Sequence, residues 1–113
     1  MHEYSIAVEL LRSIEAAARP YEDAAVQCVH LRIGELAGVE ADLLASAFEL
    51  VRPGTICAAA QLEIRPSPAV WSCSLCGKAI ETGAALRCPE CDVPARMESG
   101  DEILLERLEM EVG

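Results

Sequence analysis

The stretch that decides the fold is Cys73-Ser74-Leu75-Cys76, followed after eleven residues by Cys88-Pro89-Glu90-Cys91. Two Cys-x-x-Cys pairs can place four thiolates at the corners of one tetrahedron, which is the geometry of a closed structural zinc site. Gly77 and Pro89 favour tight turns in which backbone N–H groups point at the sulfurs. The spacing therefore predicts a zinc-ribbon-like module whose ligands are Cys73, Cys76, Cys88 and Cys91.

Two other uses of these cysteines have to be weighed. Two disulfides would need an oxidising compartment, and no secretory signal opens the chain. A four-thiolate iron site of the rubredoxin kind uses the same Cys-x-x-Cys turns, and spacing alone does not distinguish iron from zinc. A site with four protein ligands keeps no open position, so the chemistry of the protein is expected elsewhere.

Composition limits the class of protein. The chain has 113 residues, 52% of them apolar and only 4% aromatic, enough for one small α/β core and a satellite that folds around its metal. No apolar run approaches the ~20 residues that span a bilayer, and no Arg-rich transit segment is present. We therefore expect a soluble, cytoplasmic protein without a membrane partner.

The formal net charge of −10 indicates the kind of partner. Such a protein repels phosphate backbones and favours cations or basic protein surfaces. Many zinc ribbons bind nucleic acid through basic patches, but here the bases around the cysteines are matched by acids. The bases are Lys78, Arg87 and Arg96, and the acids are Glu81, Glu90 and Asp92. We expect no nucleic-acid partner.

Two amphipathic helices are predicted from apolar residues at three- and four-residue steps. The first starts near Tyr4 and is stopped by Pro20; its stripe is Tyr4, Ala7, Val8, Leu11, Ile14 and Ala18. The second runs from about Glu40 to Val51, with Leu44, Ala47, Phe48 and Val51 as its stripe, and Pro53-Gly54 closes it. Glu40 and Asp42 fall in its first turn, where the helix dipole favours carboxylates.

Three strands complete the predicted core. Ala25–Ile33 alternates and ends at Gly34, Leu62–Arg65 alternates until Pro66-Ser67-Pro68 breaks it, and Ile103–Val112 alternates after a Ser99-Gly100-Asp101 turn. The simplest layout pairs the last two strands antiparallel, with the cysteine module as an enlarged hairpin tip. We therefore predict an α/β (α+β) domain of two helices and a three-stranded sheet, residues 1–67 plus 99–113, and an inserted four-cysteine domain, residues 68–98.

Three further residues carry possible metal donors. Cys28 and Cys57 have no Cys-x-x-Cys partner and are interpreted as small apolar core residues. His30 can be a ligand, but a single histidine in a strand is more often a solvated or hydrogen-bonded side chain.

The order of features along the chain is distinctive. Met1-His2-Glu3-Tyr4-Ser5 opens it, Ile33-Gly34-Glu35 and Ser46-Ala47-Phe48-Glu49 follow, and the paired Cys-x-x-Cys turns come last. The sequence resembles the HypA/HybF family of nickel metallochaperones over essentially its whole length. The resemblance implies an α/β nickel-binding domain, a structural zinc domain, and His2 as the indispensable nickel ligand. Partners implied by the resemblance are a HypB-type GTPase and the NiFe-hydrogenase large subunit; urease maturation is a second duty of some members.

The N-terminus offers a chemically suitable nickel site. The Met1 amine and the amide nitrogen and imidazole of His2 close fused chelate rings, and nitrogen donors in a plane suit Ni(II). Histidine is large, so Met1 is expected to survive processing. The fourth donor is Glu3, the next backbone amide or water. Glu40 falls where some family members carry an acidic residue proposed to contact nickel or the GTPase, although aspartate is usual there.

The leading hypothesis is a nickel carrier, a hydrogenase-maturation accessory protein that is a monomer or a weak homodimer. The alternative is a zinc-ribbon adaptor or a rubredoxin-like electron-transfer module in which the four-cysteine site is the whole function. An enzyme is not expected, because the sequence has no Gly-rich phosphate loop and no assignable nucleophile with its base.

Overall fold

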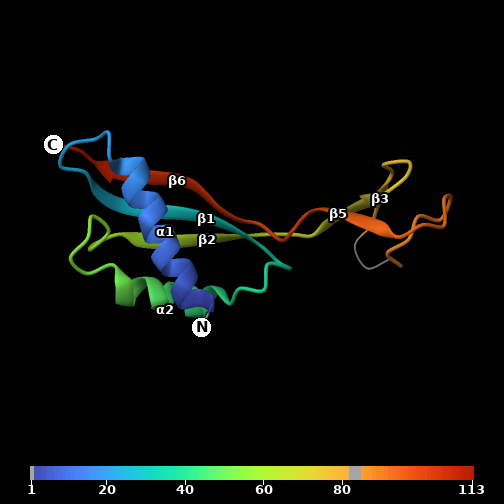
Figure 1. The fold of residues 1–113 in the computed structure, drawn as a ribbon, viewed down its shortest axis with the longest axis horizontal. Helices are drawn as coiled ribbons and strands as arrows, with labels where there is room; N and C mark the ends of the chain where they lie inside the picture. The colour runs from blue at the N-terminus through green and yellow to red at the C-terminus, as the bar shows by residue number, and fades with distance from the viewer. Residues whose placement is uncertain (1, 82–84) are drawn as a thin grey trace. The chain divides into compact units, whose positions relative to one another are not determined.

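The computed structural model describes residues 2–81 and 85–113, with only the backbone of His2. The described chain forms two compact units (Figure 1). Unit 1 combines the residues up to Arg32 with Val39–Arg65 and Leu104–Gly113, and unit 2 combines Ile33–Gly38 with Pro66–Ile103. The described residues contain two helices and two small three-stranded sheets, which confirms the predicted mixed α+β class with a zinc-ribbon-like part.

Unit 1 contains both helices, α1 (His2–Ala18) and α2 (Ala41–Val51), which pack against each other. The α2 stripe is confirmed at Leu44, Ala47 and Phe48, which are buried, whereas its fourth residue, Val51, is only partly buried. The core of the unit is made by the apolar faces of α1, α2 and β1 (Ala25–Gly34), together with buried loop residues. Neither helix is long and apolar enough to cross a membrane.

The predicted stripe of α1 is wrong in part. Tyr4 is 54% exposed, whereas Leu10, which was left out of the stripe, is buried together with Ala7 and Ile14. Leu10 and Leu11 are adjacent, and periodicity alone cannot say which of two neighbouring leucines faces the core. The structure buries the first of the pair.

The sheet of unit 1 corrects two predictions. Its order is β2–β1–β6, with β2 at Gln61–Ser67 and β6 at Ile103–Glu111, so β1 lies between the two strands that were predicted to pair. β1 is the most buried of the three strands, as expected for the strand in the central position. Pro66 also does not break β2. It is tolerated because β2 is an edge strand, where a residue without an N–H leaves no ladder bond unmade.

Unit 2 is built on β3 (Val70–Cys73), which pairs antiparallel with β4 (Ala79–Ile80) and with β5 (Ala95–Ser99). The backbone of Ile33–Gly38 forms hydrogen bonds both with the segment that enters this sheet and with the segment that leaves it. The Gly34 N–H donates to the Glu102 carbonyl at 2.8 Å, and the Leu36 N–H donates to the Gly100 carbonyl at 2.7 Å. On the entering side, the Glu35 N–H donates to the Ser67 carbonyl at 2.8 Å.

Two glycines, Gly34 and Gly100, allow these backbone segments to lie this close together. A Cβ at Gly34 would lie 2.1 Å from the carbonyl carbon of Gly100, closer than any real contact. Gly100 has a φ of 122°, and a Cβ there would lie 2.5 Å from the Ala69 Cα. The close approach of Gly34 to Gly100 and that of Gly100 to Ala69 therefore require glycine at both positions.

The boundaries of the units can be compared with the predicted domains. Unit 2 includes the whole predicted insertion, residues 68–98, and also takes in Ile33–Gly38 and the flanking residues to Pro66 and Ile103. The assignment of nickel binding to one domain and zinc binding to the other stays a prediction.

Candidate metal centres

The first cysteine turn begins where β3 ends. The Cys73 N–H donates to the Lys78 carbonyl, and the Gly77 N–H donates back to the Cys73 carbonyl at 3.1 Å. This turn aims the N–H groups of Leu75 and Cys76 at the Cys73 sulfur, both at 3.3 Å. Gly77 closes it with a φ of 77°, which explains the glycine after the second cysteine.

The second turn repeats the first. The Cys88 N–H donates to the Val93 carbonyl, the Asp92 N–H donates to the Cys88 carbonyl at 2.8 Å, and the Cys91 N–H lies 3.4 Å from the Cys88 sulfur. Asp92 occupies the position equivalent to Gly77 and has a φ of 52°. Aspartate is one of the few residues that tolerate this backbone region. The aspartate that directly follows Cys91 was therefore a sign of the second turn, and it was not used in the prediction.

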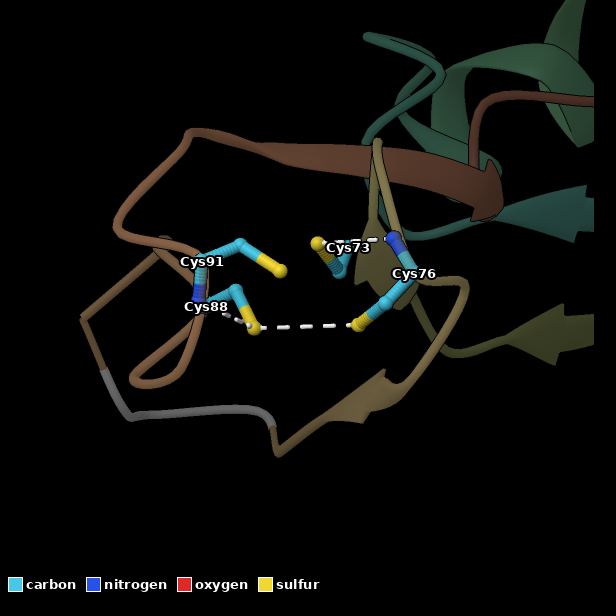
Figure 2. Close-up of side chains that lie close together, drawn as sticks. All are labelled: Cys73, Cys76, Cys88 and Cys91. Carbon is cyan, nitrogen blue, oxygen red and sulfur yellow. Dashed lines mark hydrogen bonds between the residues drawn. The ribbon is translucent and has the colours of Figure 1, made fainter.

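The two turns bring the four sulfurs together, as Figure 2 shows. All four lie within 4.8 Å of one another, and Cys76 Sγ and Cys88 Sγ are 3.9 Å apart. A tetrahedral ion with metal–sulfur bonds of about 2.3 Å needs sulfurs about 3.8 Å apart. All six cysteines are free thiols. The arrangement therefore fits a single tetrahedral metal ion, and the two disulfides that were weighed as an alternative are not formed.

The thiols of the cluster differ in pKa, because backbone N–H groups point at some sulfurs and neighbouring thiols crowd others. The Cys76 N–H is the main cause that lowers the pKa of the Cys73 thiol to about 6, against its burial, and the Leu75 N–H adds to it. Hydrogen bonds with Cys76 and Cys73 raise the pKa of Cys91 to about 12. Four like charges this close are not stable without a cation, so full ionisation of the group requires a metal.

Few apolar side chains support this sulfur cluster. Ile80 is buried with Cys73 and Cys88, and Trp71, Val93 and Ala95 are only partly buried around them. Such a small cluster stabilises a fold weakly, so a bound metal is expected to supply much of the folding energy.

The predicted nickel residues are placed only in part. Met1 lies outside the described residues, as does the side chain of His2, whose backbone begins α1. Glu3 follows in the first turn, and its Oε2 accepts a hydrogen bond from the Glu40 backbone N–H at 3.1 Å. Glu40 is the N-cap of α2, and its own side chain forms no capping bond. The structure thus brings together the N-terminal ends of both helices, and with them Glu3 and Glu40.

This contact gives Glu3 a structural role that can be separated from metal binding. Glu3→Ala should lower the free energy of unfolding by about 0.5–1.5 kcal/mol, because the Glu40 N–H loses its acceptor. Glu3→Gln should cost less, because the amide oxygen still accepts. Urea denaturation of both variants measures the difference, with Glu40→Ala as the control that keeps the donor. Equal losses for Gln and Ala at position 3 would mean that the carboxylate charge, not the hydrogen bond, stabilises the contact.

The three remaining candidates lie in unit 1. Cys28 and Cys57 are buried, as predicted for apolar core residues. Burial raises the pKa of both thiols, that of Cys57 to about 11. His30 is hydrogen-bonded, as expected for a strand histidine, with its Nε2 2.5 Å from Glu109 Oε2. The grouping of Cys28, His30 and Glu63 was not predicted, because Glu63 comes from a different strand.

Comparison with known proteins gives a consistent result. The family model described as "Hydrogenase/urease nickel incorporation, metallochaperone, hypA" matches residues 1–110. Hydrogenase maturation factor HypA of Dehalococcoides mccartyi (strain CBDB1) is 39% identical over 113 residues, which cover 98% of this chain and 95% of the relative. The protein of the same name from Rhodobacter capsulatus is 39% identical over 112 residues, covering 97% of this chain and 99% of the relative.

Solved structures agree with the sequence comparison. The fold is similar to the solution structure of the Ni metallochaperone HypA from Helicobacter pylori, with a TM-score of 0.76, 26% identity and 98% of both chains covered. A second solution structure, of a HypA protein, gives a TM-score of 0.79 and 28% identity, covering 98% of this chain and 97% of the other. Family match, relatives and fold lead to one conclusion: this chain belongs to the HypA family of hydrogenase maturation factors.

Proposed function

We propose that this protein binds Ni(II) at its N-terminus and delivers it during maturation of NiFe-hydrogenase, as a carrier without substrate turnover. The observation that carries the proposal is the match to the nickel-incorporation family from residue 1, which includes the Met1-His2-Glu3 start. The relatives are named as maturation factors and, in one solved structure, as a nickel metallochaperone. We place its action in the cytoplasm.

The described start of α1 supports this site chemically. The first four N–H groups of an α-helix have no intrahelical partner, so a helix that begins at His2 does not engage the His2 amide nitrogen in its ladder. That nitrogen, the Met1 amine and the His2 imidazole form the proposed donor set. The Glu3 carboxylate is the proposed fourth donor, with the next backbone amide or water as alternatives. The Glu40 backbone lies beside the Glu3 carboxylate, and the proposed role of the Glu40 side chain is to add negative charge near the metal.

We propose zinc for the four-cysteine centre. Cys73, Cys76, Cys88 and Cys91 would hold Zn(II) in a closed tetrahedron, and the ion would stabilise the fold of unit 2 without a part in nickel transfer. The proposed partners are a HypB-type GTPase, which would supply the nucleotide hydrolysis, and the hydrogenase large subunit as nickel acceptor. A net charge of −10 favours basic surfaces on these partners.

Nickel titration of the untagged, zinc-loaded protein at neutral and mildly acidic pH tests the proposal. We expect one tight equivalent of Ni(II) at neutral pH and much weaker binding in acid. The sign follows from competition: unperturbed amine and imidazole groups, with pKa values of about 8 and 6.5, take up protons as the pH falls and then cannot bind the metal. Zinc content measured in parallel is the control. Tight binding that is unchanged in acid would contradict an amine and imidazole donor set.

A further inference from the structure

A second group of metal-binding side chains lies in unit 1, on the strands β1 and β2. Cys28, His30 and Glu63 each offer a donor atom, and these atoms lie within 4.8 Å of one another. Cys28 and His30 are two residues apart on β1, so their side chains leave the same face of the sheet. Glu63 reaches them from β2, the neighbouring strand. Three residues on two strands, neither of which carries a metal motif, are thus brought together by strand pairing.

His30 is oriented as a metal-binding histidine should be. Its Nε2 lies 2.5 Å from Glu109 Oε2 on β6, while its Nδ1 faces Glu63, at 3.8 Å from Oε1. A proton on Nε2, donated to Glu109, leaves the lone pair of Nδ1 available on the side of Glu63 and Cys28. A carboxylate behind the histidine is the arrangement that supports histidine ligands in metalloproteins. Arg107 Nη2 donates to the same Glu109 oxygen at 2.9 Å and holds that carboxylate in place; it also lies 3.3 Å from His30 Nε2, which cannot accept its hydrogen bond while it carries the proton given to Glu109.

The charges favour a cation at this point. Glu63 and Glu109 face one guanidinium, that of Arg107, which leaves an excess of one negative charge while Cys28 is a thiol and of two once a bound cation has displaced its proton. The side chains of Glu63 and Glu109 are 63% and 49% exposed, so both can adjust. Movement of about 1 Å brings the three donors to the spacing of a metal with bonds of about 2.0–2.3 Å.

We propose that Cys28, His30 and Glu63 form a second metal site, which binds a divalent transition-metal ion of the zinc, cobalt and nickel type. One sulfur, one imidazole nitrogen and one carboxylate oxygen are a donor set of intermediate softness, which suits these ions and not Mg²⁺ or Ca²⁺. Binding displaces the Cys28 thiol proton to solvent. Three protein ligands leave a position for water, so the ion exchanges more readily than one held by four cysteines. Glu109 is a positioning residue that acts through His30.

Co(II) added to the full-length protein that holds only one equivalent of zinc, the amount the four-cysteine centre takes, tests this site, because a cobalt–thiolate bond gives a charge-transfer absorption that zinc lacks. We expect one equivalent of Co(II) to produce this absorption with no release of zinc. Cys28→Ser should abolish it, whereas Cys57→Ala, which removes the other buried thiol of unit 1, should leave it unchanged. Glu109→Gln should weaken Co(II) binding by about 10–100-fold.

Further variants keep the test decisive if Cys28→Ser does not fold, as judged by far-UV circular dichroism. Glu63 is exposed, so Glu63→Gln leaves the core intact and should weaken Co(II) binding at least as much as Glu109→Gln. His2→Ala should have no effect, which distinguishes this site from the proposed N-terminal one. The proposal is overturned if no such absorption appears, if it comes with zinc release, or if it is unchanged in Cys28→Ser or in Glu63→Gln. The group would then be only an ion-pair cluster across the sheet.

Discussion

The double variant Cys73→Ala/Cys88→Ala should lose the fold of residues 71–97 while both helices stay largely formed. One cysteine is removed from each turn, so the tetrahedron cannot close. Structural zinc in small modules supplies about 10–16 kcal/mol, far more than the few apolar side chains around Ile80 can replace. The core of unit 1 contains neither cysteine and should keep its helices.

Two spectroscopic signals separate the units in one sample. Trp71 is the only tryptophan and packs against the sulfur cluster, so its fluorescence reports unit 2 and should shift to that of an exposed indole. Far-UV circular dichroism reports α1 and α2, which lie in unit 1. Leu75→Ala/Glu90→Ala, at two exposed positions of the same turns, is the matched control and should change neither signal. Loss of nearly all helix signal would show that the units fold as one cooperative core.

The metal content of the wild-type protein belongs to the same experiment. A colourless protein that holds one equivalent of zinc agrees with the proposal, whereas a red one with charge-transfer absorption would show iron and favour electron transfer. The four sulfur positions fit either ion.

His2→Ala, and separately one glycine added before Met1, should each weaken tight nickel binding by at least about 100-fold, since each removes part of the chelate. The added glycine keeps every side chain but moves the amine one residue away from His2. Isothermal titration with Ni(II) measures the loss, and zinc content should not change. One glycine added after Gly113 is the control for chain length. Near-native affinity in the N-terminally extended protein would show that the amine is not a ligand and would move the site to His2 with Glu3, Glu40 or His30.

The parts of the fold that depend on local pattern were predictable. Cys-x-x-Cys spacing predicted the sulfur cluster, and the apolar steps predicted both helices to within two residues at each end. Strand order was not predictable from alternation alone, because alternation identifies a strand's faces but not its neighbours. β2 and β6 were therefore expected to pair with each other, whereas each of them pairs with β1. Pro66 was interpreted as a break because an edge position is known only once the sheet order is known.

Contacts between residues far apart in the chain could not be predicted from the sequence. The bond from the Glu40 N–H to Glu3 joins residues 37 positions apart and depends on how α1 packs on α2. The Cys28, His30 and Glu63 group likewise depends on the register of β2 against β1. In both cases the residue types were visible in the sequence, and only the packing brought them together.

The backbone contact between Gly34 and Gly100 affects how the sulfur cluster assembles. Hydrogen bonds from Ile33–Gly38 hold the chain at Ser67 next to the chain at Gly100 and Glu102, and none of these bonds involves a cysteine. The segment between them is therefore a loop whose ends are held together by bonds that need no ion. Closing a long loop costs entropy that grows with its length, and a loop with anchored ends has less left to lose when the two turns meet. The glycine contact thus raises the effective concentration of one cysteine pair near the other, and a side chain at either glycine would weaken metal capture without touching a ligand.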